Sequence, residues 1–155
     1  MEDLEADLKE SGLYPLLYIW DAEEPWPTLQ TLIDQNQRLV ITTEHGTPPP
    51  SWVHHLWDIA WDTPYSFDTT DDFSCSPNRG DTENALFLVN HWLAGEYGLP
   101  SESEAKIANS YDVLHGRAVD CWNEAGQRPN FIAVDWYHEG ALFDVTRALN
   151  QRLAP

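Results

Sequence analysis

Three segments of the chain share one pattern, in which a short apolar run ends in polar side chains. They are residues 39–45, 86–91 and 131–137. Near-continuous apolar runs are typical of strands in a parallel sheet. The carboxyl ends of such strands meet at one edge, where sites of α/β barrels lie. The pattern therefore predicts that the polar residues closing these runs lie near one another: Glu44, His45, Asn90, His91 and Asp135.

Asp135 is the strongest single candidate for a residue that takes part in chemistry. It follows the apolar residues 131–134, so its carboxylate is expected to be partly removed from water. Such a group needs a partner, for example a His or an Arg, to remain charged at low cost. A structural role, in which the carboxylate accepts from loop N–H groups, is the alternative.

Two histidines follow strand ends beside other polar residues: His45 after Glu44, and His91 after Asn90. A His that is held by a carboxylate can act as a general base or as a metal ligand. The six His of the chain show no regular ligand spacing, so we expect no metal. We predict that these four residues bind substrate, or else form a polar rim that caps loop backbone groups.

Two further residues are substrate-binding candidates. Arg79 lies in a loop beside Gly80, and a guanidinium there can bind a phosphate in bidentate fashion. In an acidic chain it can equally form a structural ion pair. Tyr137 can contribute to an apolar or sugar-stacking wall, with core packing as the alternative.

The charge of the chain excludes some partners. There are 8 basic and 26 acidic residues, which gives a net charge of -18. Such a field repels nucleic acid and anionic lipid surfaces. No apolar run is long enough to span a bilayer, and the acidic start of the chain is unlike a signal peptide. The localisation is not predicted.

The 155 residues suit a single domain, residues 1–155. The two cysteines, Cys75 and Cys121, form no C-x-x-C motif. A disulfide and a pair of buried thiols both remain open. No glycine-rich phosphate fingerprint follows a strand, which disfavours a nucleotide-binding fold, and we expect no cofactor. No G-x-S-x-G motif is present, which disfavours an ordinary serine hydrolase.

Strands that alternate with helices are predicted to position these residues. Helices are expected over residues 2–11, 28–35, 52–57, 101–122 and 142–149. Strands are expected over residues 38–43, over 84–92 and from 131, with a short strand or buried segment over 13–20. A long loop is expected over residues 58–81. Such alternation implies right-handed crossovers and a parallel sheet, that is, an α/β fold.

The order of these segments resembles the C-terminal part of the phosphatidylinositol-specific phospholipase C-like phosphodiesterases. The matching pieces are WPTL at 26–29, RLVI at 38–41, FSCSPNRG at 73–80, LFLVNHW at 86–92 and PNFIAVDWY at 129–137. The resemblance implies a TIM-type (β/α) barrel, of which this chain is the C-terminal half. It also implies cleavage of phosphodiesters by two His, which come from the first half of the barrel, in a family whose members are often secreted.

By this resemblance Asp135 orients a catalytic His that lies outside the chain. The chain is then a phosphodiesterase-like domain that is incomplete or inactive alone, with a phosphodiester or inositol-type ligand. A half barrel leaves strand edges and one sheet face exposed, which favours a homo-oligomer or a complementary half barrel. The alternatives are a non-catalytic binding or self-assembly module, and a metal-dependent hydrolase built on Glu44, His45, His91 and Asp135.

Overall fold

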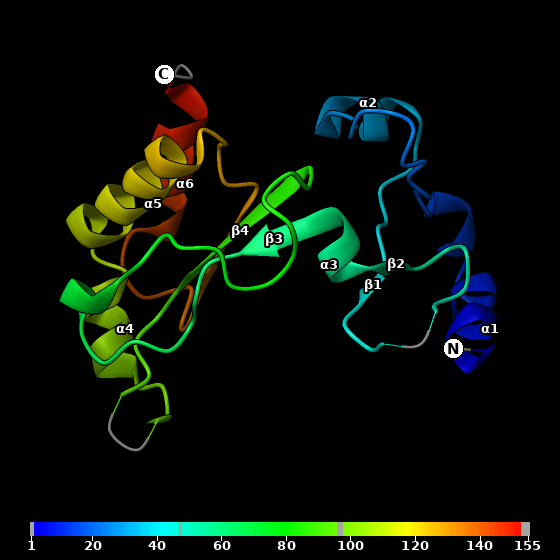
Figure 1. The fold of residues 1–155 in the computed structure, drawn as a ribbon. Helices are drawn as coiled ribbons and strands as arrows, with labels where there is room; N and C mark the ends of the chain where they lie inside the picture. The colour runs from blue at the N-terminus through cyan, green and yellow to red at the C-terminus, as the bar shows by residue number, and fades with distance from the viewer. Residues whose placement is uncertain (1, 47, 96–97, 153–155) are drawn as a thin grey trace. The chain divides into compact units, whose positions relative to one another are not determined.

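The computed structural model describes residues 2–46, 48–95 and 98–152, and it divides the chain into two compact units. Unit 1 comprises Met1–Ile59 and unit 2 comprises Ala60–Pro155 (Figure 1). Each unit has its own strands and its own apolar clusters, so each is described separately.

Unit 1 packs short elements around a small core. Its elements are α1 (Glu2–Glu10), η1 (Tyr14–Leu16), α2 (Leu29–Asp34), β1 (Thr42–Thr43), β2 (His54–His55) and α3 (Leu56–Ile59). β1 and β2 pair in parallel. The buried side chains of the core come from α1, from the segment after η1 and from the turn before β2, and they are Leu8, Leu17, Trp52 and Val53.

The structure confirms two predicted helices of unit 1 and corrects a third. α1 and α2 lie where they were expected, and the Oγ1 atom of Thr28 caps α2 by accepting from the Thr31 amide at 3.1 Å. The predicted helix over 52–57 is wrong for most of its length. His54 instead begins β2, and its amide donates to the carbonyl of Ile41 at 2.9 Å. Backbone pairing with β1 has overridden the helical spacing of the aromatic residues.

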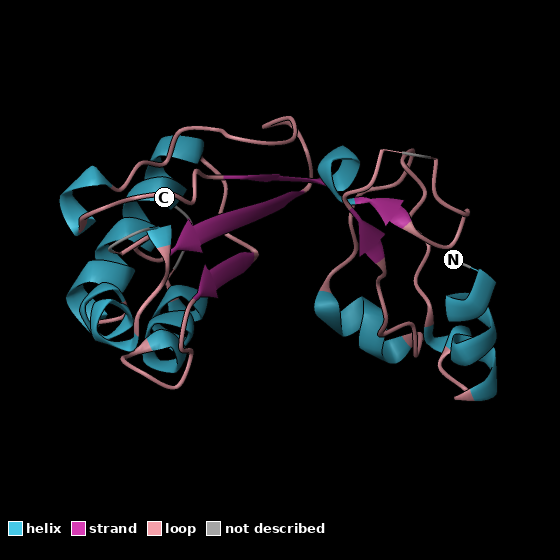
Figure 2. Cartoon of the chain, turned by 90° about the horizontal axis from the view of Figure 1, so that it is seen from below, coloured by secondary structure: helices cyan, strands magenta, loops and turns pink. Residues whose placement is uncertain are grey.

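Unit 2 consists of a three-stranded parallel sheet and the helices that connect and follow its strands. Its elements are β3 (Ala60–Asp62), η2 (Thr70–Asp72), β4 (Leu86–His91), α4 (Glu102–Ala108), α5 (Tyr111–Ala125), β5 (Phe131–Val134) and α6 (Leu142–Gln151). The strand order is β3-β4-β5. Figure 2 distinguishes the strands from the helices by colour. In the register Asp62 pairs with Leu88, and Asn90 pairs with Ala133. The carboxyl ends of the three strands therefore meet at one edge.

The two faces of this sheet have different roles, because side chains alternate along each strand. On one face Phe87 and Val89 pack with Cys121 of α5, and Ile132 and Val134 pack against the core of α5 and α6. Asp62, Leu88, Asn90, Phe131 and Ala133 alternate with these residues and so belong to the other face. Asp62 and Asn90, at the carboxyl edge, thus lie on the face opposite α5 and α6.

Two features of unit 2 differ from the sequence predictions, and a third decides between two alternatives that the sequence left open. β3 lies inside the segment that was expected to be a loop. The helix predicted over 101–122 is broken into α4 and α5 at Asn109, a residue that is 1% exposed. Cys75 and Cys121 form a disulfide with a Cα–Cα distance of 5.0 Å, which settles the alternative that the sequence left open.

The expected α/β class with parallel strands is confirmed, as two small parallel sheets. Ser101 caps the N-terminus of α4, since its Oγ atom accepts from the Glu104 amide at 3.3 Å. Among the residues that the structure describes, no helix has the length and apolar character required to cross a membrane.

Candidate functional site

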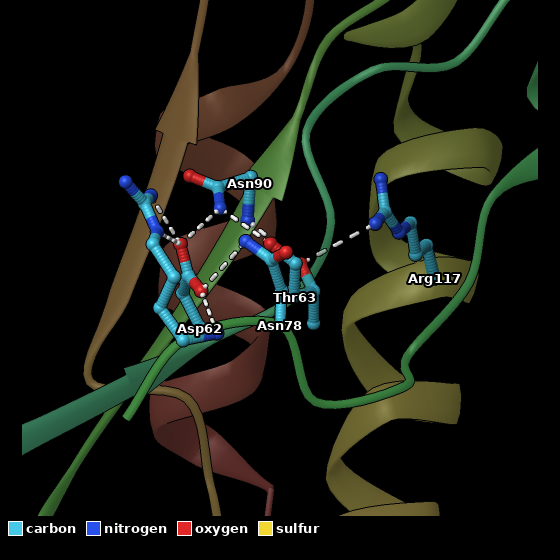
Figure 3. Close-up of polar contacts among 6 residues, drawn as sticks. Asp62, Thr63, Asn78, Asn90 and Arg117 are labelled. Carbon is cyan, nitrogen blue, oxygen red and sulfur yellow. Dashed lines mark hydrogen bonds and ion pairs between the residues drawn. The ribbon is translucent and has the colours of Figure 1, made fainter. Parts of the chain in front are cut away.

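The candidate site is centred on Asp62, the last residue of β3, whose side chain is 0% exposed. Its Oδ2 atom accepts from Arg79 Nε at 3.0 Å and from Asn90 Nδ2 at 2.9 Å. Its Oδ1 atom accepts from the Arg79 amide at 2.9 Å and from Asn78 Nδ2 at 3.2 Å (Figure 3). A buried carboxylate requires such partners. We call Asp62, Asn78, Arg79 and Asn90 the Asp62 cluster.

The long loop that follows β3 brings Arg79 back to this strand. Asp62 and Arg79 form an isolated antiparallel bridge, in which the Asp62 amide donates to the Arg79 carbonyl at 3.0 Å. The next residue, Gly80, has a φ of 76°, a conformation that costs a residue with a Cβ atom. A Cβ atom at Gly80 would also collide with the carbonyl oxygen of Ala60. The glycine is therefore needed for the approach of this loop to β3.

Thr63 connects the Asp62 cluster to α5. Its Oγ1 atom accepts from the Asn90 amide at 3.1 Å and from Arg117 Nη2 at 3.4 Å, and its carbonyl accepts from Asn90 Nδ2 at 2.6 Å. Arg117 reaches Thr63 from α5 (Figure 3) and also donates to the Ser74 carbonyl at 3.0 Å. The guanidinium is 4.1 Å from the Phe73 ring centroid, which favours its charge by a cation–π interaction. Burial lowers the pKa of Arg117 to about 10, so it stays charged at neutral pH.

His91 lies apart from its neighbour Asn90 because consecutive side chains of a strand point to opposite faces. Its ring is 0% exposed, with Nε2 at 2.8 Å from the Ala108 carbonyl and the ring centroid 4.6 Å from that of Phe73. Burial lowers the pKa of His91 to about 4. The ring is therefore neutral at physiological pH and donates through Nε2, which gives His91 a packing role between β4 and α4.

Asp135 follows β5 at the same edge of the sheet, and it is half-buried. Its Oδ2 atom is buried without a hydrogen-bond partner, and burial raises the pKa of this carboxyl. The next residue, Trp136, has a φ of 45°, which is unfavourable for a bulky side chain. Backbone strain beside an unsatisfied carboxylate is typical of functional sites.

The loop that contains Asp135 is fixed by Asn109, at the break between α4 and α5. Asn109 Nδ2 donates to the carbonyls of Asp135 at 2.9 Å and Glu139 at 3.2 Å. Tyr137, in the same loop, is 63% exposed, and its ring meets that of Phe143 edge to face. Tyr137 thus contributes an aromatic surface close in sequence to Asp135.

Glu44 and His45 follow β1 in unit 1, whereas the Asp62 cluster and Asp135 belong to unit 2. Both residues are exposed, and the His45 amide donates to Thr43 Oγ1 at 3.2 Å. Within the described ranges, no group of three or more His, Cys, Asp or Glu side chains is arranged to hold a metal ion.

The structure thus unites two of the predicted site residues, Arg79 and Asn90, around a carboxylate that the sequence reasoning missed. The missed residue, Asp62, ends the run Ile59-Ala60-Trp61 in the same apolar-to-polar manner as the three recognised strands. The signal was present, but three apolar residues beside a Pro- and Asp-rich segment were too few to indicate a strand.

Comparisons with known proteins point to one family. A family model described as PI-PLC X 1 matches residues 1–150. An uncharacterized secreted protein of Arthroderma benhamiae is 24% identical over 178 residues, an alignment that covers 97% of this chain and 40% of that protein. The chain thus spans about 40% of the length of this relative. No solved structure matches the chain. Because the family model covers nearly all of the sequence, the chain belongs to the PI-PLC X family.

Proposed function

We propose that this chain is a phospholipase C-like phosphodiesterase domain that binds the phosphate of a phosphodiester or inositol-type ligand and lacks the catalytic histidine pair. One observation carries the proposal: a buried carboxylate at the carboxyl edge of a parallel sheet orients an arginine, in a chain of the PI-PLC X family. We further propose that residues 1–155 form a single domain corresponding to the C-terminal half of a TIM-type barrel.

The geometry of Arg79 supports a role in phosphate binding. Asp62 fixes the guanidinium through Nε at 3.0 Å, and the Arg79 side chain is nevertheless 34% exposed. A guanidinium that is held in one orientation loses less entropy when it binds an anion. Asn90 holds the Asp62 carboxylate from the other side at 2.9 Å. The Asp62 cluster is therefore preorganised before any ligand binds.

Asp135 fits the supporting role that the family resemblance implies. Its Oδ2 atom has no hydrogen-bond partner, and burial raises its pKa. A carboxylate in this state would be stabilised by an imidazole N–H. We propose that Asp135 orients a histidine from outside this chain, and that the exposed ring of Tyr137 forms a wall of the same site.

The disulfide and the relative favour an extracytoplasmic location. The Cys75–Cys121 bond requires an oxidising compartment to persist, and the relative is described as secreted. We propose that this chain also functions outside the reducing cytoplasm.

Calorimetric titration with inositol 1-phosphate, with myo-inositol as the phosphate-free reference, tests the function. We expect saturable binding of the phosphate alone, and weaker binding for Arg79→Lys, which retains a cation but loses the planar fork. The matched control is Arg147→Lys on the exposed face of α6, where Arg147 pairs with Asp144. Equal heats for both inositols would contradict the proposal, and so would turnover of a phosphodiester by the chain alone, since the proposal assigns it no catalytic pair.

A second candidate, a self-assembly module, is favoured by Phe131. This residue is 51% exposed, and it lies on the sheet face opposite α5 and α6. An exposed aromatic residue there can be covered by a second copy or by a complementary half barrel. Light scattering of the native chain and of Phe131→Ser tests this function: the native chain should associate, and the variant should be monomeric.

A further inference from the structure

Unit 1 carries three neighbouring aromatic rings, Tyr18, Trp20 and Trp26, of which Trp26 contacts the other two; we call them the aromatic cluster. The ring centroid of Trp26 is 5.7 Å from that of Tyr18 at 81°, and 5.4 Å from that of Trp20 at 56°. Tyr18 and Trp20 are two residues apart on an extended segment, and both stand against Trp26. All three rings are half-buried, so each retains accessible surface.

Three carboxylates adjoin the aromatic cluster in the chain: Asp21, Glu23 and Glu24. The Trp20 indole donates through Nε1 to the Glu24 carbonyl at 2.9 Å, and Asp21 Oδ1 accepts from the Glu23 amide at 3.1 Å. These bonds fold the acidic turn onto Trp20. Burial raises the pKa of Tyr18, and the negative charges of Asp21 and Glu24 add to this effect. Two of the carboxylates therefore act on the same aromatic surface.

The cations of unit 1 are engaged elsewhere. Lys9 binds Glu5 at 2.6 Å and lies 4.9 Å from the Tyr14 ring centroid, and Arg38 donates to Asn36. His54 accepts from the Trp20 amide through Nε2 at 3.3 Å. In the described part of unit 1, then, no ammonium or guanidinium is recorded over the aromatic cluster.

We propose that the aromatic cluster and its acidic turn bind a methylated ammonium group. Aromatic faces attract a weakly hydrated cation through their quadrupoles. Neighbouring carboxylates add Coulomb attraction, and the -18 charge of the chain raises the local concentration of cations. The surface fits this ligand better than a neutral apolar one, because a neutral ligand gains nothing from the carboxylates. This site is independent of the phosphate site proposed above.

Fluorine NMR of the chain labelled with 5-fluorotryptophan tests the proposal. The chain contains eight Trp, and the resonances of Trp20 and Trp26 are assigned from Trp20→Phe and Trp26→Phe. Tetramethylammonium chloride is the probe, tert-butanol is its neutral counterpart, and sodium chloride corrects for ionic strength. We expect saturable shifts confined to these two resonances, with a dissociation constant on the order of 1–10 mM.

Two double variants distinguish the effect of the neighbouring carboxylates on binding from the effect of the net charge of the chain. Asp21→Asn with Glu24→Gln should weaken binding by about two- to fivefold, the size expected for exposed charges. Asp3→Asn with Asp7→Asn on α1 removes the same net charge and should leave binding unchanged. Equal shifts with tert-butanol, uniform shifts of all eight resonances, or identical titrations for the two double variants would overturn the proposal. The unaffected Trp resonances report whether each variant remains folded.

Discussion

The side-chain amide of Asn90 donates to Asp62 Oδ2 at 2.9 Å and to the Thr63 carbonyl at 2.6 Å. One residue of β4 thus uses its side chain to hold the carboxyl end of β3. Asp62 and Asn90 are 0% and 2% exposed, so neither can replace these bonds with bonds to water. The residues of the candidate site therefore also stabilise the contact between β3 and β4.

Replacing Asn90 should destabilise unit 2. Asn90→Ala removes two donors and leaves buried acceptors on Asp62 and Thr63 without one partner each, which costs about 1–3 kcal/mol per unsatisfied group. Urea unfolding followed by circular dichroism measures the loss. Asn150→Ala, at an exposed position of α6, serves as the control. Equal unfolding free energies for the two variants would contradict the structural role of Asn90.

Gly80→Ala should be more destabilising than Gly126→Ala, although both glycines have positive φ, 76° and 65°. The left-handed conformation costs an alanine about 1–2 kcal/mol at either position. Only at Gly80 would the new Cβ atom collide with the Ala60 carbonyl, since Gly126 has no atom within 4 Å of that position. Thermal unfolding of both variants, compared with the native chain, tests the difference. Equal losses would show that the turn at Gly80 is less crowded than described.

His91 should make the chain less stable in mild acid. Its pKa is about 4 in the folded state against 6.5 for the free side chain, so the unfolded chain binds a proton more readily. The stabilisation is complete above pH 6.5 and is lost as the pH falls toward 4, by about 3 kcal/mol. His91→Gln, which retains a donor, should have a flatter profile in urea unfolding between pH 7 and 4. In the native chain, the NMR signal of the His91 ring should not titrate above pH 5.

Reducing the disulfide should lower stability without a change in sequence. Cys75 and Cys121 are 46 residues apart, and a loop of that length corresponds to about 4 kcal/mol in the chain-entropy model. Unfolding with and without a dithiol reductant measures the effect, and mass spectrometry counts the free thiols. The Cys75→Ala/Cys121→Ala variant should match the reduced native chain and should be insensitive to reductant. If the reductant also lowered the stability of that variant, the loss of stability would not be due to this disulfide.

Local signals in the sequence predicted much of the fold. The apolar runs of β4 and β5 each depend on neighbouring residues, and the structure contains both strands. β3 was missed because its strand character comes from pairing with β4, at residues distant in sequence. The break at Asn109 was missed for a similar reason, since its side chain is held by the loop after β5.

The candidate site was predicted only in part. Asn90 was expected at the edge of the sheet and Arg79 in a loop, and the two residues meet at Asp62. His91 was expected beside them, but the alternation of side chains along β4 places it on the helix side of the sheet. The pattern of residue types predicts where a strand ends. The face of the sheet on which each side chain lies depends on the register of the strand.

The position of the disulfide also bears on how the chain is made. Both cysteines precede β5 in the sequence, and the bond joins the loop after β3 to α5. During synthesis from the N-terminus, the bond can close before the last strand and α6 have emerged. The bond would then hold α5 close to β3 and β4. β5 would complete the sheet by pairing with the side of β4 that β3 does not occupy. Closure of the bond at that stage would thus favour the correct strand order.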